Sequence, residues 1–164
     1  MAIQYADGSS SNNGRQISSH YASYDTLLNM STNSGVNILT INVTPKSNNS
    51  RFLITASCSW SASNNDCYIN VRRDSNSIEM SGDSSNRTKC HFGCHYDRSQ
   101  FDQSRETVVL RDHPNTASQV SYQVLVYRSG GSNGNLYVNR NQHNDNREFD
   151  PAGICFLIVE EFAP

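Results

Sequence analysis

The sequence predicts an all-β protein: a single β-sandwich or jelly-roll-like domain of about eight antiparallel strands, preceded by an extended N-terminal arm. Three observations favour this fold class. The length of 164 residues is typical of one domain. From Val36 onward, short runs alternate between apolar and polar residues, as half-buried strands do. Clusters of serine and asparagine, which favour turns, separate these runs, and no segment has the period of an amphipathic helix.

The predicted arm covers residues 1–35, where aromatic and aliphatic residues follow no period that would bury them locally. Apolar groups left exposed on a monomer favour association, so we expect the arm to contact neighbouring subunits. The alternative, weighed equally for residues 1–15, is a loose terminus without an assembly role. The residues expected in assembly contacts are Ile3, Tyr5, Tyr21, Tyr24, Leu27 and Leu28.

The predicted β-sandwich domain covers residues 36–164. In its first strand, apolar residues alternate with Thr40 and Asn42, and Pro45 ends the strand because proline lacks an N–H for the ladder. The second strand, 51–61, places Trp60 among the apolar residues of one face. The other strands are expected, in order, at residues 67–72, 88–96, 105–111, 120–128, 136–140 and 153–162.

The closing strand differs from the others because residues 154–159 are apolar on both faces. A strand of this kind needs a cover on each side. We therefore expect it in the centre of a sheet or against another subunit.

Composition excludes several partners. The net charge is -2 and charged residues make up 17% of the chain, so there is no basic excess to follow a phosphate backbone, and we expect no nucleic acid partner. The longest apolar run, 154–159, is too short to cross a bilayer. The first residues lack the pattern of a secretory signal, so we expect synthesis in the cytosol and free thiols for the five cysteines.

The sharpest candidate for a metal site is Cys90-His91-Phe92-Gly93-Cys94-His95, because thiolate and imidazole bind zinc well. On a strand, however, the two cysteines share one face and the two histidines the other. The second ligand pair of a zinc site is also missing. We expect buried thiols, no metal and no other cofactor. Histidines gathered at a trimer axis remain the alternative.

Catalytic motifs are not visible. The acidic segment 145–150 lacks the spacing of a calcium loop and is expected to be solvated. No nucleophile elbow, zinc-protease helix or phosphate loop appears, so the chain is predicted not to be an enzyme. The carboxylates of a glycosidase need not be close in the chain, which leaves a depolymerase as a third, disfavoured function class.

Several phrases between residues 36 and 162 carry a family resemblance. They are Leu39-Thr-Ile-Asn-Val-Thr-Pro45, Lys46-Ser-Asn-Asn-Ser-Arg-Phe-Leu-Ile54, Asp112-His-Pro-Asn-Thr116, Tyr122-Gln-Val-Leu-Val-Tyr-Arg128, Tyr137-Val-Asn-Arg140 and the closing strand from Ile154 to Glu161. The chain thereby resembles the small β-domains of bacteriophage fibre and virion proteins, especially those from phages of marine bacteria and cyanobacteria.

The resemblance implies a non-enzymatic virion structural protein that decorates or cements the capsid or forms a short fibre. Fibre domains are usually threefold, which implies a homotrimer in contact with other virion proteins, such as capsid or tail components. The expected location is the virion, after synthesis in the host cytoplasm. The alternative is a receptor-binding domain of a tail fibre that binds a host surface glycan.

Overall fold

The computed structural model describes residues 3–4, 10–11, 14–31, 34–63, 66–80, 89–94, 103–129, 135–143 and 152–164. Within these ranges the chain is all-β, as the sequence predicts, and no helix is present. The described residues accordingly contain no helix that could span a membrane.

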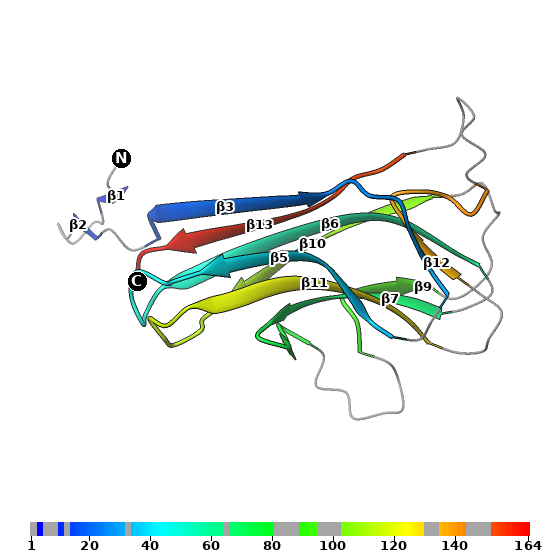
Figure 1. Cartoon of the computed structure of the whole chain (residues 1–164). Helices are drawn as coiled ribbons and strands as arrows, with labels where there is room; N and C mark the ends of the chain where they lie inside the picture. Colours follow the sequence, from blue (N-terminus) through cyan, green and yellow to red (C-terminus); the bar gives the residue numbers. More distant parts are fainter. Residues whose placement is uncertain are drawn as a thin grey trace.

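A six-stranded antiparallel sheet is organised around the long strand β6 (Figure 1). One edge of β6 pairs with β10, and the other pairs first with β13 and then with β12. The outer strands β3 and β4 pair with β13 and β12. The bounds of these strands are β3 Gln16–Tyr24, β4 Leu28–Met30, β6 Arg51–Ser63, β10 Ser104–Asp112, β12 Asn135–Val138 and β13 Cys155–Phe162.

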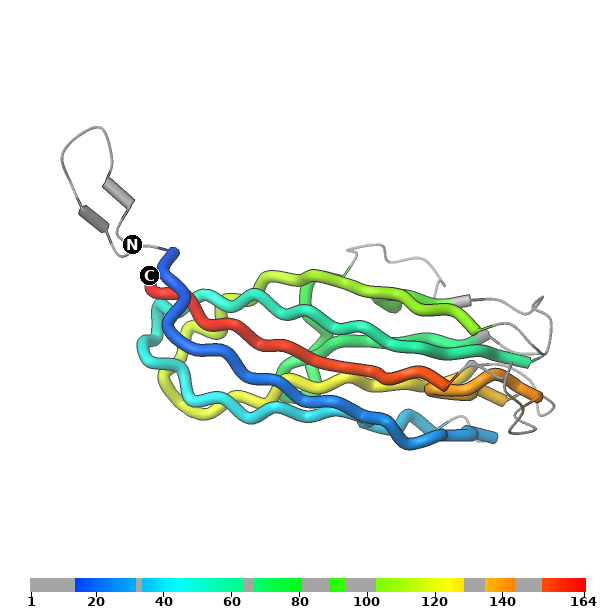
Figure 2. Tube along the Cα trace, turned by 90° about the horizontal axis from the view of Figure 1, so that it is seen from above, coloured from blue at the N-terminus to red at the C-terminus, as the bar shows by residue number. Residues whose placement is uncertain are grey.

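A five-stranded antiparallel sheet forms the second layer, and the long strands of both sheets run lengthwise along the molecule (Figure 2). Its order is β5-β11-β7, with the short strands β8 and β9 on the remaining edge of β7. The short strands β1 (Ile3–Gln4) and β2 (Ser10–Ser11) pair with each other. The bounds in the second sheet are β5 Val36–Val43, β7 Asp66–Arg73, β8 Asn76–Ser77, β9 Phe92–Cys94 and β11 Val120–Ser129.

The core lies between the two sheets. Trp60 and Leu157 contribute to it from the six-stranded sheet, and Ile69, Tyr122 and Val124 from the five-stranded sheet. Burial of one such aliphatic side chain stabilises the fold by about 1.5–3 kcal/mol. Because side chains alternate along a strand, the period-two pattern decides which face of each strand turns toward this core.

The predicted boundary at residue 35 is corrected for residues 16–30. Strands β3 and β4 lie within the predicted arm, yet they belong to the six-stranded sheet. The sequence pattern missed β3 because its inward positions include Ser18 and His20, which give no apolar alternation. An edge strand tolerates such residues because its neighbours cover it only partly. With β3, β4 and β8 added, the strands outnumber the eight expected.

The closing strand is placed as predicted. β13 lies between β3 and β6 in the six-stranded sheet. Its residues alternate between fully buried and half-buried from Cys155 to Phe162, so its second apolar face forms part of the outer surface of the sheet.

Candidate functional site

Glu161 is a fully buried carboxylate in β13. Its Oε1 accepts hydrogen bonds from the backbone N–H of Lys46 and the hydroxyl of Ser50, each at 2.6 Å. Its Oε2 accepts a third from the hydroxyl of Ser18 at 3.0 Å. A buried carboxylate requires donors of this kind. Glu161 therefore ties the loop after β5 to β13 and β3.

Asp112, the last residue of β10, joins the two sheets. Both of its carboxylate oxygens lie 2.6 Å from Nη1 of Arg73 on β7. It also accepts a hydrogen bond at 2.8 Å from the hydroxyl of Tyr122 on β11. Burial, and then the charge of Asp112, raise the pKa of Tyr122 far above its ordinary value, so the phenol remains a donor.

Asn139, directly after β12, is fully buried and has a left-handed backbone with φ of 62°. Its side-chain amide donates to the carbonyls of Tyr24 at 2.7 Å and Thr26 at 3.2 Å. Its side-chain oxygen accepts from the thiol of Cys155 at 3.2 Å. Asparagine tolerates this backbone conformation better than most residues. Like Glu161 and Asp112, Asn139 lies in one of the sequence segments that carry the family resemblance. The side chains of all three residues hold segments together that are distant in the sequence.

His91, the centre of the candidate metal motif, has both ring nitrogens occupied by backbone groups. Nδ1 accepts from the N–H of Val71 at 3.0 Å, so Nε2 carries the proton and donates to the carbonyl of Ile78 at 2.7 Å. Burial lowers the pKa of His91, against the smaller raising effects of the Ile78 carbonyl and the Glu79 charge. This neutral ring fastens β7 to the segments on either side of it and offers no lone pair to a metal.

The other members of that motif give little support to a metal site. Burial, and then the charge of Glu106, raise the pKa of the Cys90 thiol, which disfavours the thiolate that binds zinc. The side chain of Cys94, all of His95 and the acidic segment 145–150 lie outside the described residues. Among the residues that the structure does describe, no group of three or more potential ligands could hold a metal ion.

Of the six residues predicted for assembly contacts, the structure describes the side chains of four, and these differ in exposure. Tyr21 and Leu27 are exposed, at 62% and 47%. Tyr24 and Leu28 are half-buried and pack against the core of their own chain. The side chain of Ile3 and the whole of Tyr5 fall outside the described part of the chain. Assembly through these residues stays a prediction.

Tyr21 does belong to a different cluster, which crosses the outer face of the six-stranded sheet. By register, Tyr21 on β3 is opposite Ile158 on β13, which is opposite Thr55 on β6, which is opposite Val109 on β10. Val109 is 57% exposed, and the ring of Phe156 stacks with that of Tyr21 at 6.4 Å between centroids. We call these five residues the outer patch.

The sequence alone did not assemble the outer patch. It flagged Tyr21 in the arm and the second apolar face of the closing strand, but not Val109. The signal was the exposed valine at an outward position of β10. This valine can be assigned to a cluster only when the strand register is known, because the register places Val109 two strands from Ile158.

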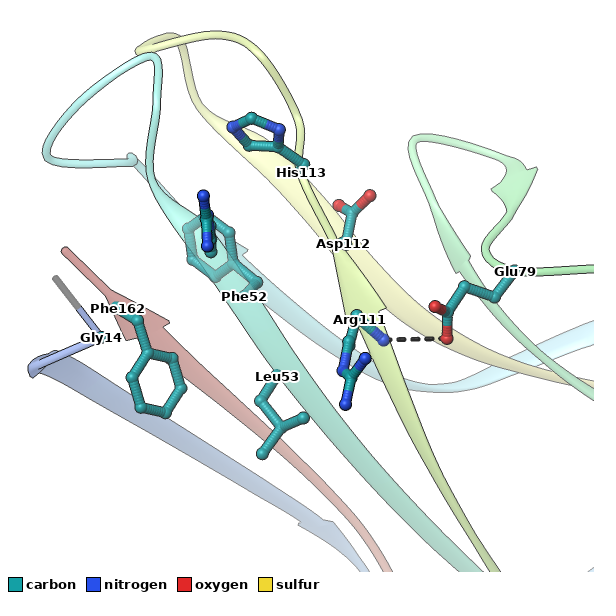
Figure 3. A pocket seen from close by; sticks show the side chains of 9 residues that line it. Gly14, Phe52, Leu53, Glu79, Arg111, Asp112, His113 and Phe162 are labelled. Carbon is teal, nitrogen blue, oxygen red and sulfur yellow. Dashed lines mark hydrogen bonds between the residues drawn. The ribbon is translucent and has the colours of Figure 1, made fainter. Parts of the chain in front are cut away.

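A hollow of about 680 Å³ opens where β13 ends (Figure 3). We call it the terminal pocket. Figure 3 shows Leu53 and Phe162 on one side of it, with Arg111 between them and Glu79. Its lining residues are Gly14, Arg51, Phe52, Leu53, Glu79, Arg111, Asp112, His113 and Phe162.

A scan against models of known protein families and a search of curated proteins find no match to this chain.

Proposed function

We propose that the chain is a non-enzymatic structural protein of a bacteriophage virion, which assembles with copies of itself through the outer patch. Its role is to decorate or cement the capsid, or to build a short fibre. The observation that supports this proposal most is the outer patch, because the exposed Tyr21 and Val109 lie in one row with the half-buried Ile158, and exposed apolar groups favour association. We propose that the assembly is a homotrimer, because the phage fibre domains that the chain resembles are usually threefold.

The strand order supports a jelly roll within this proposal. Strands β3, β13, β6 and β10 of one sheet face β5, β11, β7 and β9 of the other. Along the chain, these eight strands alternate between the sheets at every step except β7 to β9. Two interlocked Greek keys give such an order, and this architecture is common in viral capsid domains. The architecture alone is an analogy and does not fix the function.

The chemistry of the outer face suits a protein interface. The row from Tyr21 to Val109 contains no charged residue. The next row, which runs from Ser23 through Phe156 and Ser57 to Thr107, contains none either. The guanidinium of the neighbouring Arg105, however, lies over the Phe156 ring, 5.7 Å from its centroid, and donates to the Ser57 hydroxyl. Interface cores are enriched in aromatic residues and depleted of charge. Two adjacent rows without charged residues, with a single arginine stacked on Phe156, therefore favour a protein partner, since arginine is also enriched at interfaces.

The test is a double variant, Tyr21→Lys/Val109→Lys. Both side chains are largely exposed, so the fold should be unchanged. In an assembled interface, each buried ammonium would cost several kcal/mol, so we expect self-association to weaken at least about 100-fold. Size-exclusion chromatography with light scattering should show an oligomer for the unaltered chain and a monomer for the variant.

The matched control is Thr40→Lys, an exposed position on the outer face of β5 in the other sheet. It adds one positive charge to the opposite face of the molecule, and the oligomer should survive. An unaltered chain that is monomeric, or a double variant that keeps the oligomer, would contradict assembly through the outer patch.

A further inference from the structure

Two buried cysteines lie opposite each other on neighbouring strands of the six-stranded sheet. The register pairs Phe156 of β13 with Ser57 of β6. At the next position of these strands, Cys155 is therefore opposite Cys58. Both side chains are fully buried in the core, and neither forms a disulfide in the structure. Two thiols in this arrangement are a candidate site of covalent cross-linking.

The geometry of the pair suits a disulfide. Directly opposed residues of antiparallel strands have Cα atoms about 4.5–5.5 Å apart, and a disulfide spans about 4.4–6.8 Å between Cα atoms. The two thiols already share a hydrogen bond, which Cys58 donates to Cys155. The Cys155 thiol in turn donates to the side-chain oxygen of Asn139 at 3.2 Å. A bond between the two sulfur atoms therefore requires movement of the side chains rather than of the strands.

The same hydrogen bond makes the two thiols unequal. It lowers the pKa of Cys155, whose thiolate it stabilises, against the raising effect of burial. It raises the pKa of Cys58, and burial raises that pKa further. Cys155 is therefore the thiol that ionises first, and it is the thiolate that attacks a disulfide.

We propose that Cys58 and Cys155 form a cross-strand disulfide when the chain meets a small-molecule disulfide such as oxidised glutathione. The Cys155 thiolate attacks one sulfur of the oxidant, forms a mixed disulfide and displaces one glutathione thiolate. The Cys58 thiolate then attacks the Cys155 sulfur and displaces the second. The two cysteines lose two electrons and two protons, and the oxidant leaves as two molecules of reduced glutathione.

The oxidant reaches the pair at the start of β13. Cys155 is the first residue of that strand, and the preceding Ile154 is 36% exposed. The ends of strands open locally at a lower free energy than the whole domain. Separation of Cys155 from β6 exposes both sulfur atoms while the rest of the sheet stays paired.

The cross-link does not depend on the proposed function. Both sulfur atoms lie in the core, whereas the neighbouring Phe156 belongs to the outer patch on the opposite face of β13. A chain that fails to assemble can still form the disulfide, and a chain that stays reduced can still assemble.

The test is disulfide mapping of the full chain after incubation with oxidised glutathione in the absence of denaturant. Digestion with trypsin and with a protease that cleaves before aspartate separates Cys58, in peptide 52–65, from Cys67, and places Cys155 in peptide 150–164. Mass spectrometry should find these two peptides joined by a disulfide. The proposal is overturned if they remain separate, or if either is joined instead to another cysteine peptide.

Thermal unfolding shows whether the cross-link forms within the native fold. Oxidation should raise the midpoint by about 4–8 °C, because the disulfide closes a long loop in the unfolded chain. Cys155→Ser retains a hydroxyl that can donate to Asn139, and it should abolish this rise. The control Cys90→Ser changes a partly exposed thiol and should preserve it. An unaltered chain whose midpoint does not rise on oxidation, or an equal rise in Cys155→Ser, would contradict the proposal.

Discussion

Replacing Glu161 with alanine should lower the free energy of unfolding by about 4 kcal/mol. The variant loses three hydrogen bonds to a buried charged acceptor. It also leaves the Lys46 N–H and the buried Ser50 hydroxyl without their acceptor. Since domains are stable by only about 5–15 kcal/mol, this single change removes a large part of the total. Urea unfolding followed by tryptophan fluorescence measures the loss, with Trp60 as the only tryptophan.

Two further variants separate this effect from a general weakening of β13. Glu160→Ala changes the neighbouring carboxylate, which is not buried, and should cost less than about 1 kcal/mol. Glu161→Gln keeps one acceptor oxygen, and its amide can donate to the Ser18 hydroxyl, so an intermediate loss is expected. Equal losses for Glu160→Ala and Glu161→Ala would show that the buried hydrogen bonds do not hold this end of the sandwich.

Asn139→Ala should destabilise the fold by about 3 kcal/mol. The substitution leaves the carbonyls of Tyr24 and Thr26 without their donor, and each lost buried partner costs about 1–3 kcal/mol. It also forces alanine into the left-handed region, which adds about 1 kcal/mol. The measurement is the same urea titration.

Asn139→Gly provides the matched comparison. Glycine removes the same side chain but adopts a positive φ without a steric penalty. The decrease in the free energy of unfolding should therefore be about 1 kcal/mol smaller for Asn139→Gly than for Asn139→Ala. A glycine variant that is less stable than the alanine variant would contradict the role assigned to the backbone of Asn139.

The sequence predicted those strands whose inward residues are apolar. In β5, β7 and β11 the alternation is plain, and the structure places a strand at each. Strand β3 was missed because Ser18 and His20 occupy inward positions, and only pairing with β13 makes it a strand. The local sequence pattern indicates which face of a strand is buried, but not which strand it pairs with.

The candidate sites were even harder to predict, because they form only when strands distant in the sequence pair. Glu161 lies 111 residues from Ser50, and no local signal connects them. The same holds for Arg51 and Arg111 in the terminal pocket, which adjacent strands bring together. For His91 the sequence predicted no metal, but no local signal indicated that its two ring nitrogens bond to the backbone of Val71 and Ile78.

The most direct test of the proposed function is the location of the chain in phage particles purified by density gradient from lysed host cells. Quantitative mass spectrometry and immunogold electron microscopy measure its copy number and its position. The proposal predicts a fixed copy number per particle, in a multiple of three, with label on the capsid or on a fibre. A chain that is abundant in the lysate but absent from the purified particles would contradict a structural role in the virion.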